Sequence, residues 1–438
     1  MKFVCDSRPL VPVLGMALLL ALPLGVSAAG AGHGSLDPSF GQGGKVTTKI
    51  GSDDAEFGSL AIQKDGKLVA AGGSTKGFYG DDSGSDGNFV LVRYGANGSL
   101  DRSFGSGGIA KTPSGPAAIG HEPIGWATDL VIQPDGKLVA AGTTAGATCG
   151  GFLVVRFQAN GTLDRSFGSG GRIASDNAVH GALAVQPDGK LLLVSLDEGC
   201  VINAPGVFKL SRYKPNGTLD RSFGRGGTVT TPIELGPLVV QPDGKILAGG
   251  SSWNGSRYVF ALVRYNANGT LDRSFGLNGK VTTPIGLFSL VIQPDGKLVG
   301  AGSGTKGSHS VFALFRYSPS GSPDRSFGSG GSVTTAIGAD ASALTLVIQR
   351  DGKLVAAGAS RKLPSSVKGS RDVFALVRYN ADGTLDTSFG KGGIVTTAIG
   401  TGDAQPLSLI LQPRTTLLAA GRGKNGFKGV FALARYKG

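Results

Sequence analysis

One sequence unit recurs seven times along the chain, and this recurrence restricts the fold more than any other feature. Each unit contains a Ser-Phe-Gly segment, a Gln-x-Asp-Gly-Lys turn (degenerate at Gln412, in the last copy) and an apolar segment that ends in Arg-Tyr or Arg-Phe. Successive Ser-Phe-Gly segments lie 64, 63, 56, 52, 52 and 62 residues apart. Their phenylalanines are Phe40, Phe104, Phe167, Phe223, Phe275, Phe327 and Phe389. Repetition on this scale indicates a ring or an array of small structural units.

Between these markers the sequence is typical of short strands. "SLVIQPDGKLVGAG", from Ser289, places two apolar runs around a Pro-Asp-Gly turn, which predicts a β-hairpin. "VFALFRY" predicts a third strand, and "NANGTLDRSF" predicts a turn that leads into a fourth. Because the runs are apolar at consecutive positions, both faces of each sheet should be buried. We therefore predict an all-β, seven-bladed β-propeller, with a β-solenoid as the alternative.

The two ends of the repeated region complement each other. The region begins with "SLDPSFGQGG", residues 35–44, which has no third strand before it, and it finishes on Arg435-Tyr436, a third strand with no fourth strand after it. We predict that Leu36–Gly41 pairs with Phe431–Tyr436, so that the N-terminal strand completes the last blade and closes the ring. Closure of this kind removes exposed strand edges.

The combined motif "LDxSFGxGGxVTT…QPDGKLVAAG…FALVRYNADGTLD" resembles the delta-60 repeat family, exported bacterial proteins with a propeller domain of unknown function. It is also similar to the NHL-type repeat in its order of strands and turns. The resemblance covers nearly all of the chain after its first thirty residues. It implies a propeller fold and export, and it implies no activity, so no catalytic residue is carried over. The chain departs from the motif at Arg414-Thr415-Thr416, which replaces Asp-Gly-Lys, and at Arg350, which replaces the turn proline.

The first thirty residues differ from the repeats. Lys2 and Arg8 precede an apolar run, "LVPVLGMALLLALPLGV", and small residues follow it. This layout predicts a signal peptide over residues 1–28 and a propeller domain over residues 29–438. The domain should then be secreted or periplasmic and have no membrane span after cleavage; an uncleaved membrane anchor is the alternative.

Two cysteines remain after the predicted signal peptide. Cys149 lies 16 residues after Gln133, and Cys200 lies 14 residues after Gln186, so both fall in corresponding loops of neighbouring units. Oxidising compartments favour disulfides. We predict a Cys149–Cys200 disulfide, with two free thiols as the alternative.

The formal net charge of +13 is distributed over the repeats, because the unit's Lys and two Arg outnumber its two Asp in most copies. One Arg precedes the Tyr and one Asp precedes Ser-Phe, as in Arg378 and Asp386. We interpret these two as a structural pair, since a buried charge is costly unless it is paired. A ring of seven binding sites is the alternative.

A localised function should lie where the copies differ. The loops between the second and third strands share one face with the connections between blades; we call this the loop face and the opposite one the turn face. Cations gather on the loop face of the later blades and aromatic residues accompany them, a combination that suits an anionic glycan or another polyanion. A solvated surface with a few packing aromatics is the alternative. The predicted ligand-binding residues are Trp126, Trp253, Tyr258, Arg361, Lys362, Arg422 and Lys424.

Catalytic motifs are scarce. "DDSGSDGN", residues 81–88, lacks the oxygen spacing of a calcium loop. His121 and Glu122 in "GHEPIGW" carry the alternative hypothesis, a metal-dependent hydrolase at the channel mouth, of the kind known in gluconolactonase-like propellers. We expect instead a monomeric, non-enzymatic binding or scaffold module without a metal or cofactor. Its ligand would be extracellular or periplasmic, such as an anionic polymer or a protein, and not a specific nucleic acid.

Overall fold

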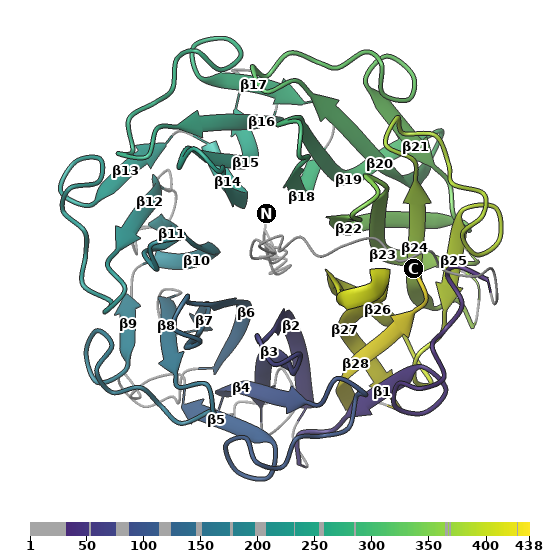
Figure 1. Cartoon of the computed structure of the whole chain (residues 1–438), viewed down its shortest axis with the longest axis horizontal. Coiled ribbons are helices and arrows are strands. Elements are labelled where there is room, and N and C mark those ends of the chain that lie inside the picture. The colour runs from purple at the N-terminus through teal and green to yellow at the C-terminus, as the bar shows by residue number, and fades with distance from the viewer. Residues whose placement is uncertain are drawn as a thin grey trace, which may run out of the picture.

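The computed structural model describes residues 32–51, 54–75, 87–113, 124–145, 151–175, 178–197, 207–231, 233–253, 258–283, 286–363, 367, 369–426 and 428–438. Within these residues the strands form seven four-stranded antiparallel sheets, and one short 3-10 helix is the only helical element. The sheets stand around a common axis (Figure 1). The predicted all-β, seven-bladed propeller is therefore confirmed.

We number the blades in chain order, and in each blade the strands run from the axis outward (Figure 1). Blade 1 contains β2 (Asp54–Ile62), β3 (Leu68–Thr75), β4 (Gly87–Tyr94) and β5 (Ile109–Pro113). Blade 2 contains β6 (Ile124–Ile132), β7 (Leu138–Ala145), β8 (Gly151–Phe157) and β9 (Arg172–Ser175). Blade 3 contains β10 (Ala178–Val185), β11 (Leu191–Asp197), β12 (Val207–Tyr213) and β13 (Thr228–Thr231). Blade 4 contains β14 (Ile233–Val240), β15 (Ile246–Trp253), β16 (Tyr258–Tyr265) and β17 (Lys280–Thr283).

The remaining blades follow the same order. Blade 5 contains β18 (Gly286–Ile292), β19 (Leu298–Lys306), β20 (His309–Tyr317) and β21 (Ser332–Thr335). Blade 6 contains β22 (Asp340–Ile348), β23 (Leu354–Arg361), β24 (Asp372–Tyr379) and β25 (Ile394–Thr397). Blade 7 contains β26 (Ala404–Leu411), the 3-10 helix η1 (Pro413–Thr415), β27 (Leu417–Asn425), β28 (Lys428–Tyr436) and, from the other end of the chain, β1 (Lys45–Thr48).

The first two strands of a blade are joined by the predicted tight turn. In blade 5 the Oδ1 atom of Asp295 accepts a hydrogen bond from the backbone N–H of Lys297 at 3.1 Å. Gly296 between them has a φ of 80°, a conformation that favours glycine. The flanking strands β18 and β19 are buried over most of their length, which is why consecutive apolar residues suit them.

The outermost strand differs from the prediction. In blade 4, "NANGTLDRSF" forms a compact turn, and the fourth strand is the later segment Lys280–Thr283. Asn268 Oδ1 accepts a hydrogen bond from the N–H of Thr270, and Asp272 Oδ1 accepts one from the N–H of Ser274. These side chains therefore occupy backbone N–H groups that would otherwise bond to a neighbouring strand. The β-branched residues that follow supply the strand instead.

Blade 7 is built from both ends of the described chain. Lys45–Thr48 pairs with Phe431–Ala434 in antiparallel register. Of the segment Leu36–Gly41, which was predicted to be the pairing strand, only Leu36 forms a bridge, to Tyr436. The predicted bounds of the pairing strand are therefore wrong. Most of Leu36–Gly41 forms the Asp-x-Ser turn that also occurs in the other blades, in which the N–H of Ser39 donates to Asp37.

Seven apolar clusters lie between adjacent blades, counted over the described residues. One of them joins blade 7 to blade 1, where the rings of Phe57 and Phe431 meet edge to face with centroids 5.7 Å apart. The predicted burial of both sheet faces is confirmed. Since apolar burial is the main favourable term in folding, each blade depends on both of its neighbours.

Candidate functional site

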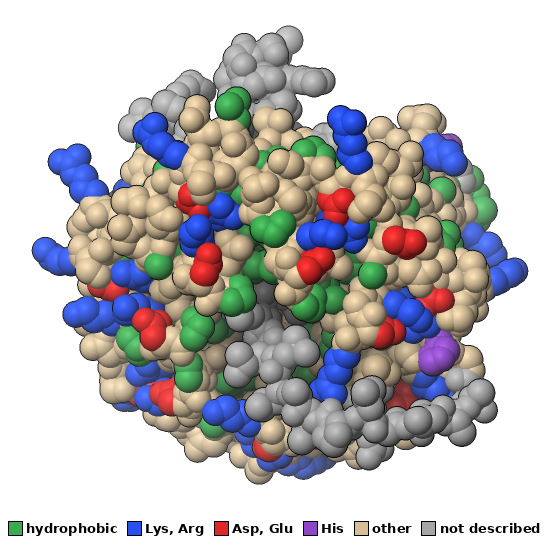
Figure 2. Space-filling view, turned by 45° about the horizontal axis from the view of Figure 1, so that its top comes forward, with side chains coloured by type: hydrophobic (Ala, Val, Ile, Leu, Met, Phe, Trp, Pro, Cys, Tyr) green, Lys and Arg blue, Asp and Glu red, His purple; other side chains and the backbone are tan. Residues whose placement is uncertain are grey.

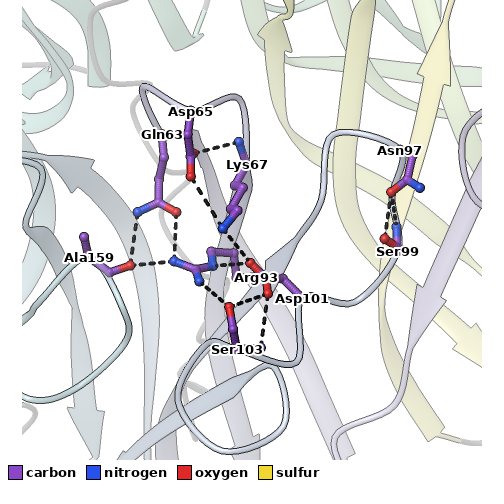
Figure 3. A network of polar contacts seen from close by, with 9 residues as sticks. All are labelled: Gln63, Asp65, Lys67, Arg93, Asn97, Ser99, Asp101, Ser103 and Ala159. Atoms are coloured by element: carbon purple, nitrogen blue, oxygen red, sulfur yellow. Dashed lines mark hydrogen bonds and ion pairs between the residues drawn. The ribbon is translucent and has the colours of Figure 1, made fainter.

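The repeated charges of a blade form one network on the turn face. In blade 1, Arg93 Nε donates to Asp101 Oδ2 at 2.9 Å, and Lys67 Nζ lies 3.1 Å from the same oxygen (Figure 3). The Arg93 guanidinium also donates to the hydroxyl of Ser103 and lies 4.7 Å from the centroid of the Phe104 ring. Arg93 is buried, so this complete set of partners offsets the loss of its hydration.

The same arginine joins its blade to the next one. Arg93 Nη1 donates to the backbone carbonyl of Ala159 at 2.7 Å, and Gln63 Nε2 donates to the same carbonyl (Figure 3). The N–H of Gly105 donates to the carbonyl of Asn160, in the same turn of blade 2. The network therefore fixes the orientation of two neighbouring blades.

The network recurs around the ring. Every blade stacks its arginine on its Ser-Phe-Gly phenylalanine at 4.6 to 4.7 Å and pairs it with the aspartate of the following turn. The arginines are Arg93, Arg156, Arg212, Arg264, Arg316, Arg378 and Arg435. These pairs have the predicted structural role. Their groups are occupied with one another, which leaves little for a ligand.

The aspartate of this network is held ionised. For Asp220 the hydrogen bond from the Ser222 hydroxyl has the largest influence, and together with the Ser222 N–H and Arg212 it outweighs burial. These contacts lower the pKa of Asp220 to about 2. A carboxylate that accepts several hydrogen bonds and faces a cation is stabilised in its charged form.

The Asn-Gly turns also have a structural use. Asn97 Oδ1 accepts hydrogen bonds from both the N–H and the hydroxyl of Ser99, at 3.0 and 2.7 Å (Figure 3). The amide oxygen thus closes the turn.

On the loop face, two predicted cations follow one another at the end of β23 in blade 6. Arg361 Nε donates to Asp372 Oδ1 at 2.8 Å, so its charge is partly neutralised within the blade. The neighbouring Lys362 is exposed and has no acidic partner among the described residues. Arg371, on the same loop, is exposed as well and donates to the carbonyl of Thr401 at 3.5 Å.

The two predicted cations of blade 7, Arg422 and Lys424, also differ in whether they face a carboxylate. Arg422 Nη2 donates to Gln405 at 2.8 Å, and its Nη1 lies 3.8 Å from a carboxylate oxygen of Glu56 in blade 1. Lys424 is exposed and, within the described part of the chain, faces no carboxylate. Lys362 and Lys424 are therefore the uncompensated members of the four predicted cations.

Three aspartates on the loop face join neighbouring blades and were not predicted from the sequence. Each accepts a hydrogen bond from a backbone N–H of the preceding blade: Asp54 from Gly429, Asp340 from Ser310 at 3.0 Å, and Asp403 from Asp372 at 2.8 Å. All three lie nine residues before the glutamine of their unit, and this common offset was the available signal.

The predicted aromatic residues lie away from these cations. Trp126 is a half-buried residue of β6 in blade 2. Trp253 and Tyr258 are register partners at the ends of β15 and β16 in blade 4. Blade 5 separates Trp253 and Tyr258 from the cations of blades 6 and 7, and blade 1 lies between Trp126 and blade 7. The structure therefore does not gather the seven predicted residues into one site.

A pocket of about 630 Å³ opens beside the loop of blade 6. Its apolar lining includes Ile337, Leu363 and Val373, and Lys362 and Arg371 supply its charge. Because Ile337 precedes the innermost strand of the blade and Thr397 ends its outermost strand, the pocket reaches across the end of blade 6. It joins two of the cations described above to an apolar surface.

Several predictions fall on residues outside the described ranges. These are the signal peptide, Cys149 and Cys200, His121 and Glu122, and most of residues 81–88. Among the described residues, no cluster of His, Cys, Asp or Glu is arranged to hold a metal ion. In the same residues, no helix has the length and apolar character that crossing a membrane requires.

The fold and its repeated network define the class of protein, a β-propeller built from one sequence unit. The family model described as "Domain of unknown function (DUF5122) beta-propeller" matches residues 63–104, 133–167, 186–223, 241–275, 293–327 and 349–389, just over half of the chain. The chain belongs to this family, and the predicted propeller family of unknown function is confirmed. A search of the curated proteins found no match.

Solved structures give more distant likenesses. An inactive virginiamycin B lyase from Staphylococcus aureus is 11% identical, with 89% of this chain and 98% of that chain covered and a TM-score of 0.46. Sqt1 from Chaetomium thermophilum is 14% identical, with 88% and 97% covered and a TM-score of 0.46. Drosophila Semaphorin 1a is 8% identical, with 89% and 88% covered and a TM-score of 0.45. No functional inference rests on likenesses this distant.

Proposed function

We propose that this protein is an exported binding module whose loop face holds an anionic oligosaccharide at the pocket of blade 6. The observation that carries the proposal is the placement of Lys362 and Arg371, two exposed cations, on an open pocket with an apolar lining. A pocket of about 630 Å³ has the volume of an ordinary small-ligand site.

The chemistry of the pocket favours a sugar acid over a neutral sugar. A guanidinium binds a carboxylate or sulfate in a bidentate manner, and an ammonium adds a point charge. The apolar faces of sugar rings would pack on Leu363 and Val373. Arg361 would contribute less, because Asp372 already occupies its Nε.

The test is calorimetric titration of the whole chain with oligogalacturonates, using neutral cello-oligosaccharides of equal length as the comparison ligands. We expect binding of the acidic series, and at least about tenfold weaker binding for Lys362→Gln combined with Arg371→Gln, since each lost charged contact costs about 1 kcal/mol or more. The matched control is Lys306→Gln with Lys424→Gln, which removes two loop-face charges outside the pocket. Equal affinity for acidic and neutral sugars, or equal loss in both double variants, would contradict the proposal.

A further inference from the structure

The charged residues of the repeat separate into a neutral paired set and one unpaired arginine. In blade 2, Arg156 and Lys137 face Asp164, and Lys137 also faces Asp135. Two cations and two carboxylates thus cancel within the network. The same four-membered set occurs in blades 1 to 6.

The unpaired arginine lies between the aspartate and the serine of the outer turn in five consecutive blades. All five copies are exposed, and none has an acidic partner among the described residues. They are Arg102, Arg165, Arg221, Arg273 and Arg325, which we call the rim arginines. The space-filling view shows Lys and Arg side chains projecting along the circumference, whereas many acidic side chains lie beside basic ones nearer the centre (Figure 2).

The turn does not need this arginine to form. Blade 6 has Thr387 at the same place, and there Ser388 still donates its N–H and hydroxyl to Asp386 at 3.1 and 2.6 Å. Blade 7 has Pro38 at this place, and Ser39 makes the same two bonds to Asp37. Folding therefore accounts for the recurrence of the aspartate and serine, but not for that of the arginine.

Exposed positions nearby are not kept uniform. The residue after Ser-Phe-Gly is Ser106 in blade 1, Arg225 in blade 3, Leu277 in blade 4 and Lys391 in blade 6, and all four are exposed. If the rim arginines recurred only because the unit was copied, these neighbouring exposed positions would be equally uniform. The arc of five guanidinium groups is thus a distinct feature of this surface.

We propose that the rim arginines of blades 1 to 5 form a binding surface for a linear anionic polysaccharide, which follows the circumference of the ring on the side of the turn face. One fixed guanidinium per blade would pair with successive carboxylate or sulfate groups of the polymer. The arc stops at Thr387 and Pro38, so it has two ends, as a linear polymer requires. This surface is separate from the pocket of blade 6, and neither proposal depends on the other.

The surroundings of the rim arginines favour a polysaccharide over the other polyanions. Proteins that bind single-stranded nucleic acid interleave cations with exposed aromatic rings, whereas the phenylalanines of these turns, such as Phe104 and Phe275, are fully buried. Binding to a membrane surface requires apolar side chains beside the cations. Leu277 is 81% exposed, but the corresponding residues of blades 1, 2, 3, 5, 6 and 7 are polar or charged.

The experiment measures binding of the full chain to heparin and to polygalacturonate over a range of salt concentrations. The test variant replaces all five rim arginines with threonine, the residue that blade 6 already has at Thr387. We expect affinity at about 0.1 M salt to fall at least tenfold and the dependence of affinity on salt to become shallower, because fewer bound counterions are released. A single variant, Thr387→Arg, lengthens the arc into blade 6 and should bind more tightly, and it keeps the test decisive if the fivefold variant does not fold.

A control variant of equal charge replaces five loop-face cations outside the pocket of blade 6 with threonine, namely Lys49, Lys306, Arg422, Lys424 and Lys428. The proposal expects this control to retain most of its affinity for the polymers. If the two fivefold variants lost affinity equally, the loss would follow from net charge alone, and the proposal would be overturned. Tighter binding to single-stranded DNA or to anionic lipid vesicles than to either polysaccharide would overturn it as well.

Discussion

Arg264 shows how one side chain can serve two blades. Its Nε donates to Asp272 at 2.7 Å within blade 4, and its Nη1 donates to the carbonyl of Pro319 in blade 5 at 2.6 Å. Its guanidinium plane also lies 4.6 Å from the centroid of Phe275. A lysine would keep the charge but could not make these contacts together, because its ammonium is a single point donor.

Arg264→Lys should therefore lower the free energy of unfolding by about 2 to 4 kcal/mol. This is less than the roughly 3 to 5 kcal/mol for removing one partner of a buried ion pair, because lysine keeps the charge. The matched control is Arg273→Lys, nine residues along the same turn and exposed, which should change it by less than about 0.5 kcal/mol. Chemical denaturation followed by tryptophan fluorescence measures both. Similar values for the two variants would show that the buried network contributes little.

At the scale of the element, the turn between β26 and β27 is the least regular of the ring. Thr415 has a φ of 66°, where the equivalent residue Gly296 has a φ of 80°. A β-branched residue is strained in this region, by roughly 1 to 2 kcal/mol for an ordinary side chain. The following residue, Thr416, has a φ of −64° and is unstrained.

Thr415→Gly should consequently raise the free energy of unfolding by about 1 kcal/mol, after the extra flexibility of glycine in the unfolded chain is subtracted. The same change one residue later, Thr416→Gly, should lower it by about 0.5 to 1 kcal/mol. Thermal melts of the two variants beside the parent check the opposite signs. Two changes of the same sign would rule out strain at Thr415.

The elements also show what could be read from the sequence. The number of blades follows from seven copies of one apolar pattern, and the turns follow from residues such as Asp295 and Gly296. The fourth strand was predicted directly after the Asn-Gly turn, but this segment continues as a turn, because side chains bond its backbone, as where Asp272 accepts the N–H of Ser274. Sequence patterns carry little information about such local competition.

The candidate site was predicted only in part, for a related reason. Lys362 and Arg361 were found from their sequence position, but Asp372, which neutralises Arg361, faces it through the register of β23 and β24. Glu56 reaches Arg422 from a different blade. The pocket depends on where Ile337 and Leu363 meet in space, and a single sequence does not encode such contacts in a readable way.

For the whole molecule, the repeated aspartate makes stability depend on acidity. In every blade the pKa of this carboxyl is lowered, to about 2 for Asp164 and Asp220 and further in others. The unfolded chain would have values near 3.9. The folded state then binds fewer protons, so the stability that these carboxylates contribute is fully present above about pH 5 and is lost progressively as the pH falls to 2 and below.

We expect the free energy of unfolding to fall steeply between about pH 4 and pH 2, and the fall to become shallower in Ser222→Ala with Ser274→Ala, which removes hydroxyl donors to Asp220 and Asp272. Ser169→Ala, at an exposed turn position, is the control and should leave the slope unchanged. Urea titrations at a series of pH values provide the measurement. A stability that does not vary over this range would refute the assignment of ionised, buried aspartates.

On the turn face, the repeated hydrogen bonds that pass from one blade to the next end on backbone carbonyls. The network arginines donate to backbone carbonyls of the next blade, such as those of Ala159, Ala267 and Pro319. The N–H of the Ser-Phe-Gly glycine donates to a carbonyl of the same turn. A carbonyl is present whatever the side chain, so these hydrogen bonds form between any two copies of the unit without a matching polar residue in the neighbour. Such units are interchangeable, which explains in physical terms how duplication and recombination of one short gene segment could have produced a closed ring while the exposed residues of each copy diverged.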